Sequence, residues 1–299
     1  MAADPPTTDA SILETVPAES TYREVDGVEL HVVAAGDPAD PLVVLLHGFP
    51  DFWYGWRHQI PALVEAGYRV LVPDQRGYNL SDKPEGLDSY RMGRLSADIA
   101  DLIASTGRES AHVVGHDWGA GVAWDLALRR PTAVDRLGIV NVPHPTVMRE
   151  MLRSNPRQLL RSWYIFSFQI PVLPEWYLAR DGARGVTDVL RATSNPGAFT
   201  DTDLAHYRAA WRRTGAARAA VDWYRALLRR RDDPPREEVP VPTLVVWGED
   251  DDALVPEMAR ESLRYCEDGR LVAFPDGSHW VHRERPETVT DHLLDHLSG

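Results

Sequence analysis

Short apolar runs of strand length alternate with helical patterns through most of this chain, and this alternation constrains the fold more than any other feature. Such alternation is typical of parallel strands joined by crossover helices. The sequence predicts a hairpin over residues 21–35 that turns at Asp26-Gly27. It then predicts buried strands over residues 41–46, 68–72 and 111–114, further strands over residues 136–140, 243–247 and 270–274, and helices over residues 96–105, 120–130, 257–265 and 286–297. We therefore expect an α/β fold with a mostly parallel central sheet.

Residues 143–236 interrupt this alternation. They are rich in Trp, Tyr and Arg, are broken by several prolines and contain no convincing buried strand. The economical interpretation is a helical cap, or lid, inserted into one α/β domain. We expect a core domain formed by residues 21–142 and 237–299, with residues 143–236 as the cap. Residues 1–20, rich in Pro, Thr, Asp and Glu, are expected to form a flexible N-terminal arm.

The charge balance argues against binding to nucleic acid. The 299-residue chain has 32 Lys and Arg against 45 Asp and Glu, a formal charge of −13, whereas binding to a duplex needs clustered cations. Its one cysteine, Cys266, cannot form an internal disulfide. The first residues lack a basic and apolar leader, and no run approaches the ~18 apolar residues of a membrane span. We expect a cytoplasmic protein without a membrane span.

The segment Gly115-His116-Asp117-Trp118-Gly119 joins a predicted buried strand to a helix of small residues. It has the Gly-x-nucleophile-x-Gly spacing of a nucleophile elbow, with aspartate where serine usually stands. Glycine allows the strand to reverse into the helix without side-chain collisions. The N–H groups and dipole at the helix N-terminus favour an ionised carboxylate there. Asp117 is the candidate nucleophile, and the simpler alternative is that it only caps the helix.

The loop His47-Gly48-Phe49-Pro50 follows the strand predicted over residues 41–46. In folds with such an elbow, a loop at this position provides one of the two oxyanion-hole donors, and the residue after the nucleophile provides the other. The backbone N–H groups of Phe49 and Trp118 are therefore the candidate donors.

Two further motifs follow later strands. Gly248-Glu249-Asp250-Asp251-Asp252 follows one predicted strand, and Gly277-Ser278-His279-Trp280 follows the last. The order nucleophile, acid, histidine is that of a hydrolase triad. A histidine suits the base near neutral pH, and a carboxylate fixes its tautomer. We expect His279 to be the base and His282 to be a surface residue, and the residues alone leave the acid open among the three aspartates.

The chain resembles the epoxide hydrolases of the α/β-hydrolase fold, its aspartate-nucleophile branch, over residues 20–297. The resemblance implies a mostly parallel core sheet with an inserted helical cap. In that family the triad acid lies three residues after the turn glycine and five before a proline, which points to Asp251. The family also has a cis bond at the position of Phe49-Pro50, and it often has glycine where this chain has Asn79, a residue that tolerates positive φ. The similar stretches are His47-Gly48-Phe49-Pro50, Asp74-Gln75-Arg76-Gly77-Tyr78, Ser81-Asp82-Lys83-Pro84, Gly115-His116-Asp117-Trp118-Gly119, Asn141-Val142-Pro143-His144-Pro145 and Gly277-Ser278-His279-Trp280.

The same resemblance implies two cap tyrosines that hold the epoxide oxygen and donate a proton as the ring opens. Tyr164 and Tyr224 match the two tyrosine segments of the family. An apolar pocket should surround the substrate beneath the cap. We expect this pocket to include His47, Pro50, Trp163 and Trp280.

These features together predict an epoxide hydrolase. Asp117 would attack the epoxide to form an ester, and His279 would activate the water that releases a vicinal diol. The expected partner is a small apolar epoxide, the expected role is detoxification by a monomer or homodimer, and no metal or organic cofactor is required. One alternative is a haloalkane dehalogenase, in which the Trp118 indole would hold the halide, although the tyrosine pair has no role there. A second alternative is a hydrolase-fold ligand-binding protein without catalysis.

Overall fold

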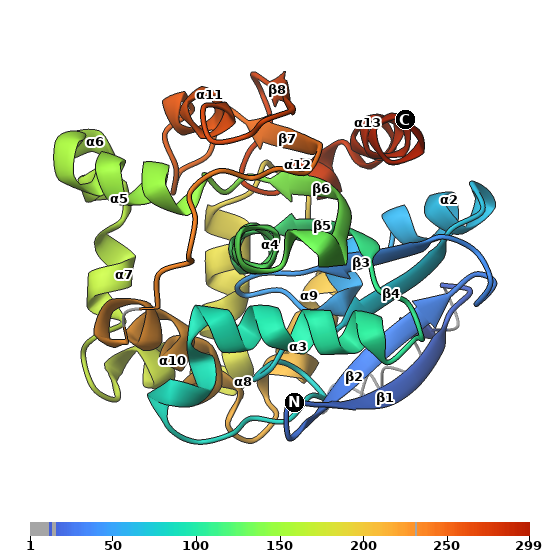
Figure 1. Cartoon of the computed structure of the whole chain (residues 1–299). Helices are drawn as coiled ribbons and strands as arrows, with labels where there is room; N and C mark the ends of the chain where they lie inside the picture. The colour runs from blue at the N-terminus through green and yellow to red at the C-terminus, as the bar shows by residue number, and fades with distance from the viewer. Residues whose placement is uncertain (1–11, 14–15, 231) are drawn as a thin grey trace.

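Eight strands form one sheet in the part of the chain that the computed structural model describes, residues 12–13, 16–230 and 232–299 (Figure 1). Their order across the sheet is β1-β2-β4-β3-β5-β6-β7-β8. Strand β2 runs antiparallel to both of its neighbours, and the other pairs are parallel. The strands are β1 Glu19–Val25, β2 Val28–Ala35, β3 Leu42–Leu46, β4 Arg69–Pro73, β5 Ala111–His116, β6 Val134–Val140, β7 Thr243–Gly248 and β8 Gly269–Phe274.

The mostly parallel sheet predicted from the sequence is confirmed, and each predicted strand is present with ends that differ by a few residues. Strand β3 is buried along its whole length, as expected for a strand covered on both faces. The predicted hairpin turn has Asp26 at φ 40° and Gly27 at φ 71°. Asn79 also has a positive φ, 37°, a conformation that asparagine tolerates better than most residues.

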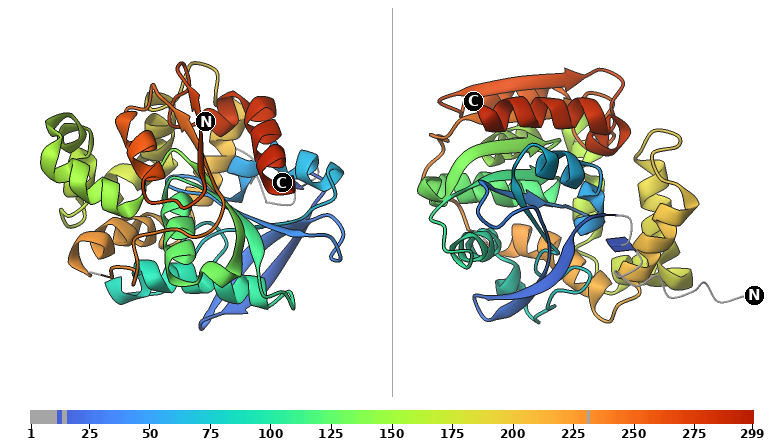
Figure 2. Two further views of the ribbon diagram at one scale, coloured as in Figure 1. Left: turned by 45° about the horizontal axis from the view of Figure 1, so that its top comes forward. Right: turned by 90° about the vertical axis from the view of Figure 1, so that its right-hand side faces the viewer.

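Helices cover both faces of the sheet (Figures 1 and 2). Helices α3 and α4 pack together, and α2 packs with α13. The helices of the core are α2 Gln59–Glu65, α3 Met92–Ala104, α4 Trp118–Arg129, α11 Glu257–Leu263, α12 Val281–Glu284 and α13 Pro286–Ser298, with short 3-10 turns at Trp53–Trp56, Leu87–Tyr90 and Pro131–Ala133.

The chain between β6 and β7 contains helices and no strand among its described residues, as the sequence predicts. We call these helices the cap. In Figure 1 the first helices of the cap lie at the left, on the side of the molecule away from β1 and β2. The cap helices are α5 Pro145–Ser154, α6 Pro156–Arg161, α7 Trp163–Ser167, α8 Leu173–Ala192, α9 Asp201–Trp211 and α10 Ala216–Arg229.

Most of the flexible arm predicted for residues 1–20 lies outside the described residues. Its described part differs from the prediction, because Ile12 and Val16 are each only 3% exposed and belong to the apolar core. Apolar side chains gain free energy by leaving water, so these two hold the chain against the domain just before β1. Within the described ranges, no helix combines the length and the apolar character needed to cross a bilayer.

The strand order explains where a site forms. From β3 the chain passes to β4 on one side and then to β5 on the other, so the direction of winding reverses between β3 and β5. In open α/β sheets, ligands bind at the carboxyl ends of the strands beside such a reversal. The loops after β3 and β5 carry the predicted oxyanion-hole donor and the predicted nucleophile.

Candidate active site

Asp117 stands at the sharp turn between β5 and α4. Its backbone has φ 50° and ψ −125°, an unusual conformation for a residue other than glycine. The turn depends on close backbone packing: a Cβ on Gly115 would lie 2.3 Å from the carbonyl oxygen of Gly119, and one on Gly48 would lie 2.3 Å from Asp117 itself. The glycines therefore allow the strained turn that raises the Asp117 carboxylate above the sheet.

Gly119→Ala is expected to destabilise the protein by roughly 2–3 kcal/mol or more, in the range of overpacked cores. A Cβ at this position would lie 2.2 Å from the backbone oxygen of Leu46, which cannot move without disturbing β3. Urea denaturation measures the effect. Gly121→Ala, two residues along the same helix, is the matched control, because the nearest atom to its Cβ is 3.7 Å away. Equal stability of the two variants would contradict this account of the turn.

The three predicted triad residues lie together at the carboxyl edge of the sheet. His279 Nδ1 is 2.7 Å from Asp251 Oδ2, and His279 Nε2 is 3.4 Å from Asp117 Oδ2. Of the three consecutive aspartates, Asp251 is buried while Asp250 and Asp252 are exposed. The imidazole thus lies between two carboxylates, with one ring nitrogen directed at each.

Asp251 is anchored by several donors. Its Oδ1 accepts hydrogen bonds from the backbone N–H groups of Ala253 (2.7 Å) and Leu254 (3.1 Å). Asn141 donates to Oδ2 at 2.8 Å, and its own Oδ1 accepts from the Gly248 N–H at 2.8 Å. Sequence reasoning assigned Asn141 no role. The sequence feature that could have identified it is its place directly after β6, at the same edge of the sheet. Its backbone has a φ of 46°, and its side chain points towards Asp251.

The charges at this site stabilise one another. Burial favours the neutral imidazole, but the carboxylates of Asp251 and Asp117 outweigh it and raise the pKa of His279 to about 10. Burial likewise disfavours the charged form of Asp117, yet the hydrogen bond and positive charge of His279 hold the pKa of Asp117 below its usual range. Burial also disfavours the charged form of Asp251, but the positive charge of His279 outweighs burial and lowers the pKa of Asp251. At neutral pH the free site contains an imidazolium between two carboxylates.

The predicted oxyanion-hole donors flank the nucleophile. The Phe49 N–H donates to Asp117 Oδ1 at 2.6 Å. Trp118 is the first residue of α4, where backbone N–H groups have no partner within the helix. The peptide bond Phe49-Pro50 is cis, as the family resemblance predicts. A carbonyl formed on Asp117 would therefore have its oxygen close to the Phe49 donor and beside the N-terminus of α4.

A cavity of about 570 Å³ opens above Asp117, within the usual range for ligand pockets. Asp117, Trp118 and His279 line it from the core, and Tyr164 on α7 and Tyr224 on α10 line it from the cap. The two tyrosine rings are 5.9 Å apart, centre to centre. Four of the five predicted catalytic residues therefore line one cavity, and the fifth, Asp251, is buried.

Two tryptophans predicted to line the pocket lie elsewhere. Trp163 is 66% exposed on the outer side of α7. Trp280 is buried behind the site, where its indole N–H donates to Thr193 Oγ1 at 2.9 Å. Their aromatic character suggested that these residues line the pocket. Whether a side chain does so depends on the direction in which it points from its own turn or helix.

His47 and Pro50 do not line the cavity either. His47 is fully buried, and its Nε2 accepts a hydrogen bond from the Gln75 N–H at 3.0 Å. The carbonyl of Pro50 accepts from the Trp211 indole at 2.8 Å. Both residues hold the loop after β3 in place, and through it the Phe49 donor.

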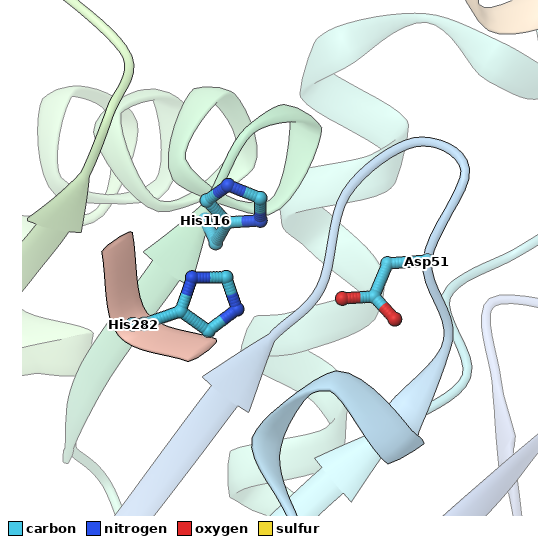
Figure 3. Close-up of side chains that lie close together, drawn as sticks. All are labelled: Asp51, His116 and His282. Atoms are coloured by element: carbon cyan, nitrogen blue, oxygen red, sulfur yellow. The ribbon is translucent and has the colours of Figure 1, made fainter. Parts of the chain in front are cut away.

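His282, predicted to be a surface residue, is fully buried beneath the site beside Asp51 and His116 (Figure 3). It lies in a short helix, α12, that turns inward and packs against Trp56. Asp51 Oδ2, His116 Nδ1 and both ring nitrogens of His282 lack a hydrogen-bond partner among the described residues. Its position three residues after His279 was the sequence feature that could have indicated a place near the site.

The ligand atoms of Asp51, His116 and His282 lie within 4.8 Å of one another, and these are atom types that bind zinc. The charges nearby oppose a cation at this position. Burial lowers the pKa of His282 well below its usual value, and the guanidinium groups of Arg283 and Arg57 lower it further. Arg283 also contributes positive charge at Asp51. We therefore describe the cluster as a buried polar layer behind His279.

Comparison with known proteins places this geometry in context. The family model described as the alpha/beta hydrolase fold matches residues 41–286. The chain is 45% identical to the AB hydrolase superfamily protein YfhM of Bacillus subtilis, over 93% of this chain and 97% of that protein. It is 35% identical to Epoxide hydrolase 1 of Caenorhabditis elegans, over 94% of this chain and 70% of that protein.

A solved structure is also closely similar. The epoxide hydrolase of Bacillus megaterium, in complex with an inhibitor, superimposes with a TM-score of 0.87 at 32% sequence identity. The match covers 93% of this chain and the whole of that one. The sheet and the helical cap are therefore both shared with a protein of known structure.

Proposed function

The chain is a hydrolase of the α/β-hydrolase fold family, in the group that contains the epoxide hydrolases, and we propose that it converts an epoxide and water to a vicinal diol through an ester of Asp117. The observation that carries the proposal is the pair of cap tyrosines, Tyr164 and Tyr224, facing the Asp117 carboxylate across one cavity. A carboxylate nucleophile opposite two proton donors suits attack on a carbon whose leaving oxygen must be protonated.

The tyrosines are suited to donate. Burial raises the pKa of Tyr164 and of Tyr224, and the negative charge of Asp117 raises both further. Both phenols therefore stay protonated at neutral pH. Among the residues that the structure describes, no side chain or backbone acceptor takes the proton of either hydroxyl in a hydrogen bond, so both are available to a substrate oxygen.

The first step forms the ester. A carboxylate oxygen of Asp117 attacks one epoxide carbon, the bond from that carbon to the ring oxygen breaks, and a tyrosine proton passes to the leaving oxygen. The phenolate that remains regains its proton from the imidazolium of His279 by way of solvent. Each tyrosine stabilises negative charge that develops only as the ring opens, which is the condition for lowering the barrier.

The second step hydrolyses the ester. His279 Nε2 accepts a proton from water while the water oxygen attacks the carbonyl carbon of the Asp117 ester. Asp251, 2.7 Å from Nδ1, holds the ring in the required tautomer and stabilises its positive charge. The N–H groups of Phe49 and Trp118 stabilise the tetrahedral oxyanion. As this intermediate collapses, the bond from its carbon to the diol oxygen breaks, and that oxygen takes up the proton that the attacking water oxygen retained. This releases the diol and restores the Asp117 carboxylate.

A paired assay on purified protein tests the reaction class. A small aromatic epoxide and a terminal alkyl bromide are offered separately, and diol and free bromide are measured. The Trp118 indole also lines the cavity beside Asp117 and could hold a halide, so the comparison is a real one. Diol without bromide is expected. Bromide without diol would identify a dehalogenase, and ligand binding without either product would identify a binding protein.

Replacing both Tyr164 and Tyr224 by Phe is expected to slow ester formation by roughly 10²–10⁴-fold, the usual contribution of general acid catalysis. Phenylalanine keeps the rings that pack in the cap, so the fold should be retained. Rapid-quench analysis of a single turnover measures the step directly. Tyr177→Phe, at a partly exposed position on α8, is the control. A double variant with the normal single-turnover rate would refute the proposed proton donors.

A further inference from the structure

Exposed apolar side chains are concentrated on the cap. Of the twelve large apolar residues that are exposed in the described part of the chain, eleven lie between residues 159 and 228, and nine of these lie within residues 159–177. Single exposed apolar residues are normal on a protein surface, but a contiguous group marks a site of interaction. Six of them, which we call the apolar strip, are Leu160, Trp163, Phe166, Val172, Leu173 and Trp176.

The strip follows one continuous stretch of chain, from the end of α6 through α7 to the first turns of α8. On α7, Trp163 and Phe166 are three residues apart and share one side of the helix, whereas Tyr164 and Ile165 line the cavity from the other side. Helices α6 and α7 form the left edge of the molecule in Figure 1. The strip therefore lies on the outer side of the cap, opposite the cavity.

Val172 stands in the middle of the strip in an unfavourable backbone conformation. It has φ 69° and ψ −38°, and the Leu173 N–H donates to the Pro171 carbonyl at 2.8 Å, which makes a γ-turn of the rare, strained kind. A β-branched residue is an outlier at positive φ, whereas glycine adopts it freely. The Val172 side chain is 73% exposed, so it contributes little packing in return. An apolar group at this position points to a contact outside the chain.

The charge of the cap is opposite to that of the rest of the chain. Residues 143–236 contain 16 Arg and no Lys against 9 Asp and Glu, a formal charge of +7, although the whole chain is at −13. Arginines also border the strip. Arg157 shares α6 with Leu160, and Arg229 on α10 donates to the Gln169 carbonyl at 2.9 Å. Aromatic and aliphatic side chains bordered by cations are typical of a surface that binds an anionic membrane interface.

We propose that the cap docks on the surface of an anionic bilayer through the apolar strip. Tryptophan favours the boundary between lipid headgroups and acyl chains, and each arginine near this boundary is attracted to anionic lipids. The remainder of the chain, at −20, is repelled by the same surface, so only the cap can face it. A second copy of the chain fits the strip less well, because pairing two strips would bring together two caps of +7.

Sedimentation with sucrose-loaded vesicles measures this contact and needs no turnover, so its outcome is independent of the proposed reaction. Vesicles of phosphatidylglycerol and phosphatidylcholine in equal amounts are compared with vesicles of phosphatidylcholine alone. At low salt we expect the protein to bind the anionic vesicles at least about tenfold more tightly, because several arginines approach the surface. The difference should shrink in about 0.5 M salt. Absence of binding to the anionic vesicles at low salt would overturn the proposal.

The double variant Trp163→Ser with Trp176→Ser is expected to lower the vesicle partition coefficient by at least roughly tenfold, because both indoles leave water on docking. Its thermal unfolding should be nearly unchanged, since both side chains are exposed. Tyr22→Ser is the matched control: it removes the exposed aromatic ring on β1, outside the cap, and should bind vesicles normally. Undiminished binding by the double variant would reject the strip as the contact.

Val172→Gly separates docking from folding. Glycine relieves the strain of the γ-turn, so the midpoint of thermal unfolding should not fall. Vesicle binding should nevertheless decrease severalfold, because an apolar side chain is lost from the strip. A less stable variant that binds vesicles as well as the unchanged protein would show that Val172 serves the fold and not the membrane contact.

Analytical ultracentrifugation without lipid distinguishes a bilayer from a second copy of the chain. The unchanged protein and the double variant should have the same oligomeric state, because the strip is reserved for lipid. A dimer that dissociates in the double variant would assign the strip to a contact between copies and would overturn the proposal.

Discussion

Asp117→Ala is expected to abolish epoxide turnover, with a loss of at least roughly 10⁴-fold, as when other enzymes lose their nucleophile. The variant retains the cavity, the tyrosines and the oxyanion-hole donors, but no remaining group in the cavity can form the ester. Its fold should be intact, because the Asp117 side chain makes no capping hydrogen bond to α4. Diol formation measured over long incubations, together with a thermal unfolding curve, provides the result.

The matched controls for this variant are Asp250→Ala and Asp252→Ala. Both aspartates are exposed and lie on either side of Asp251 in the sequence. Each variant removes one carboxylate, so the net charge changes by the same amount as in Asp117→Ala. They should have near-normal activity. Substantial turnover by Asp117→Ala itself would rule out the covalent route and favour direct attack by water.

His279→Gln is expected to stop the reaction after one turnover of ester formation. Glutamine can still donate to Asp251, so the loop should keep its position, but it cannot accept a proton from water. Intact-protein mass spectrometry after mixing with substrate should show the protein mass increased by the mass of one substrate molecule. The steady-state rate should fall by roughly 10³–10⁴-fold.

The adduct provides the decisive controls. The double variant Asp117→Ala with His279→Gln should show no added mass, which assigns the linkage to Asp117. His292→Gln, on the terminal helix α13, should turn over normally and accumulate nothing. If His279→Gln neither accumulates an adduct nor loses activity, His279 does not activate the water.

The turn at Asp117 and the position of His279 could be predicted because each depends on a short local pattern. A buried strand followed by Gly-x-Asp-x-Gly specifies where the Asp117 side chain points, and loops after parallel strands meet at one edge of the sheet. His279 was identified by its place after the last strand. The choice of Asp251 needed the resemblance to a family, because nothing in the local sequence distinguishes it from Asp250 and Asp252. In the folded protein Asp251 differs from both by being buried.

The lining of the pocket could not be predicted in the same way. Trp163 and Tyr164 are consecutive residues on α7, yet one is exposed and the other faces Asp117. Successive residues on a helix point about 100° apart, so their roles depend on how the helix is rotated against the core. That rotation is set by packing between elements distant in the sequence. The burial of His282 could not be predicted for the same reason.

The ion pair between Asp117 and His279 has a consequence for the timing of the two half-reactions. While Asp117 is ionised, it helps to keep the imidazole protonated, so His279 cannot yet deprotonate water. In the proposed mechanism, esterification would remove that negative charge and lower the pKa of His279, while the Asp251 carboxylate would continue to raise it. Under the proposed mechanism, His279 would therefore become a better base only after Asp117 has reacted, and release of the diol would restore the ion pair.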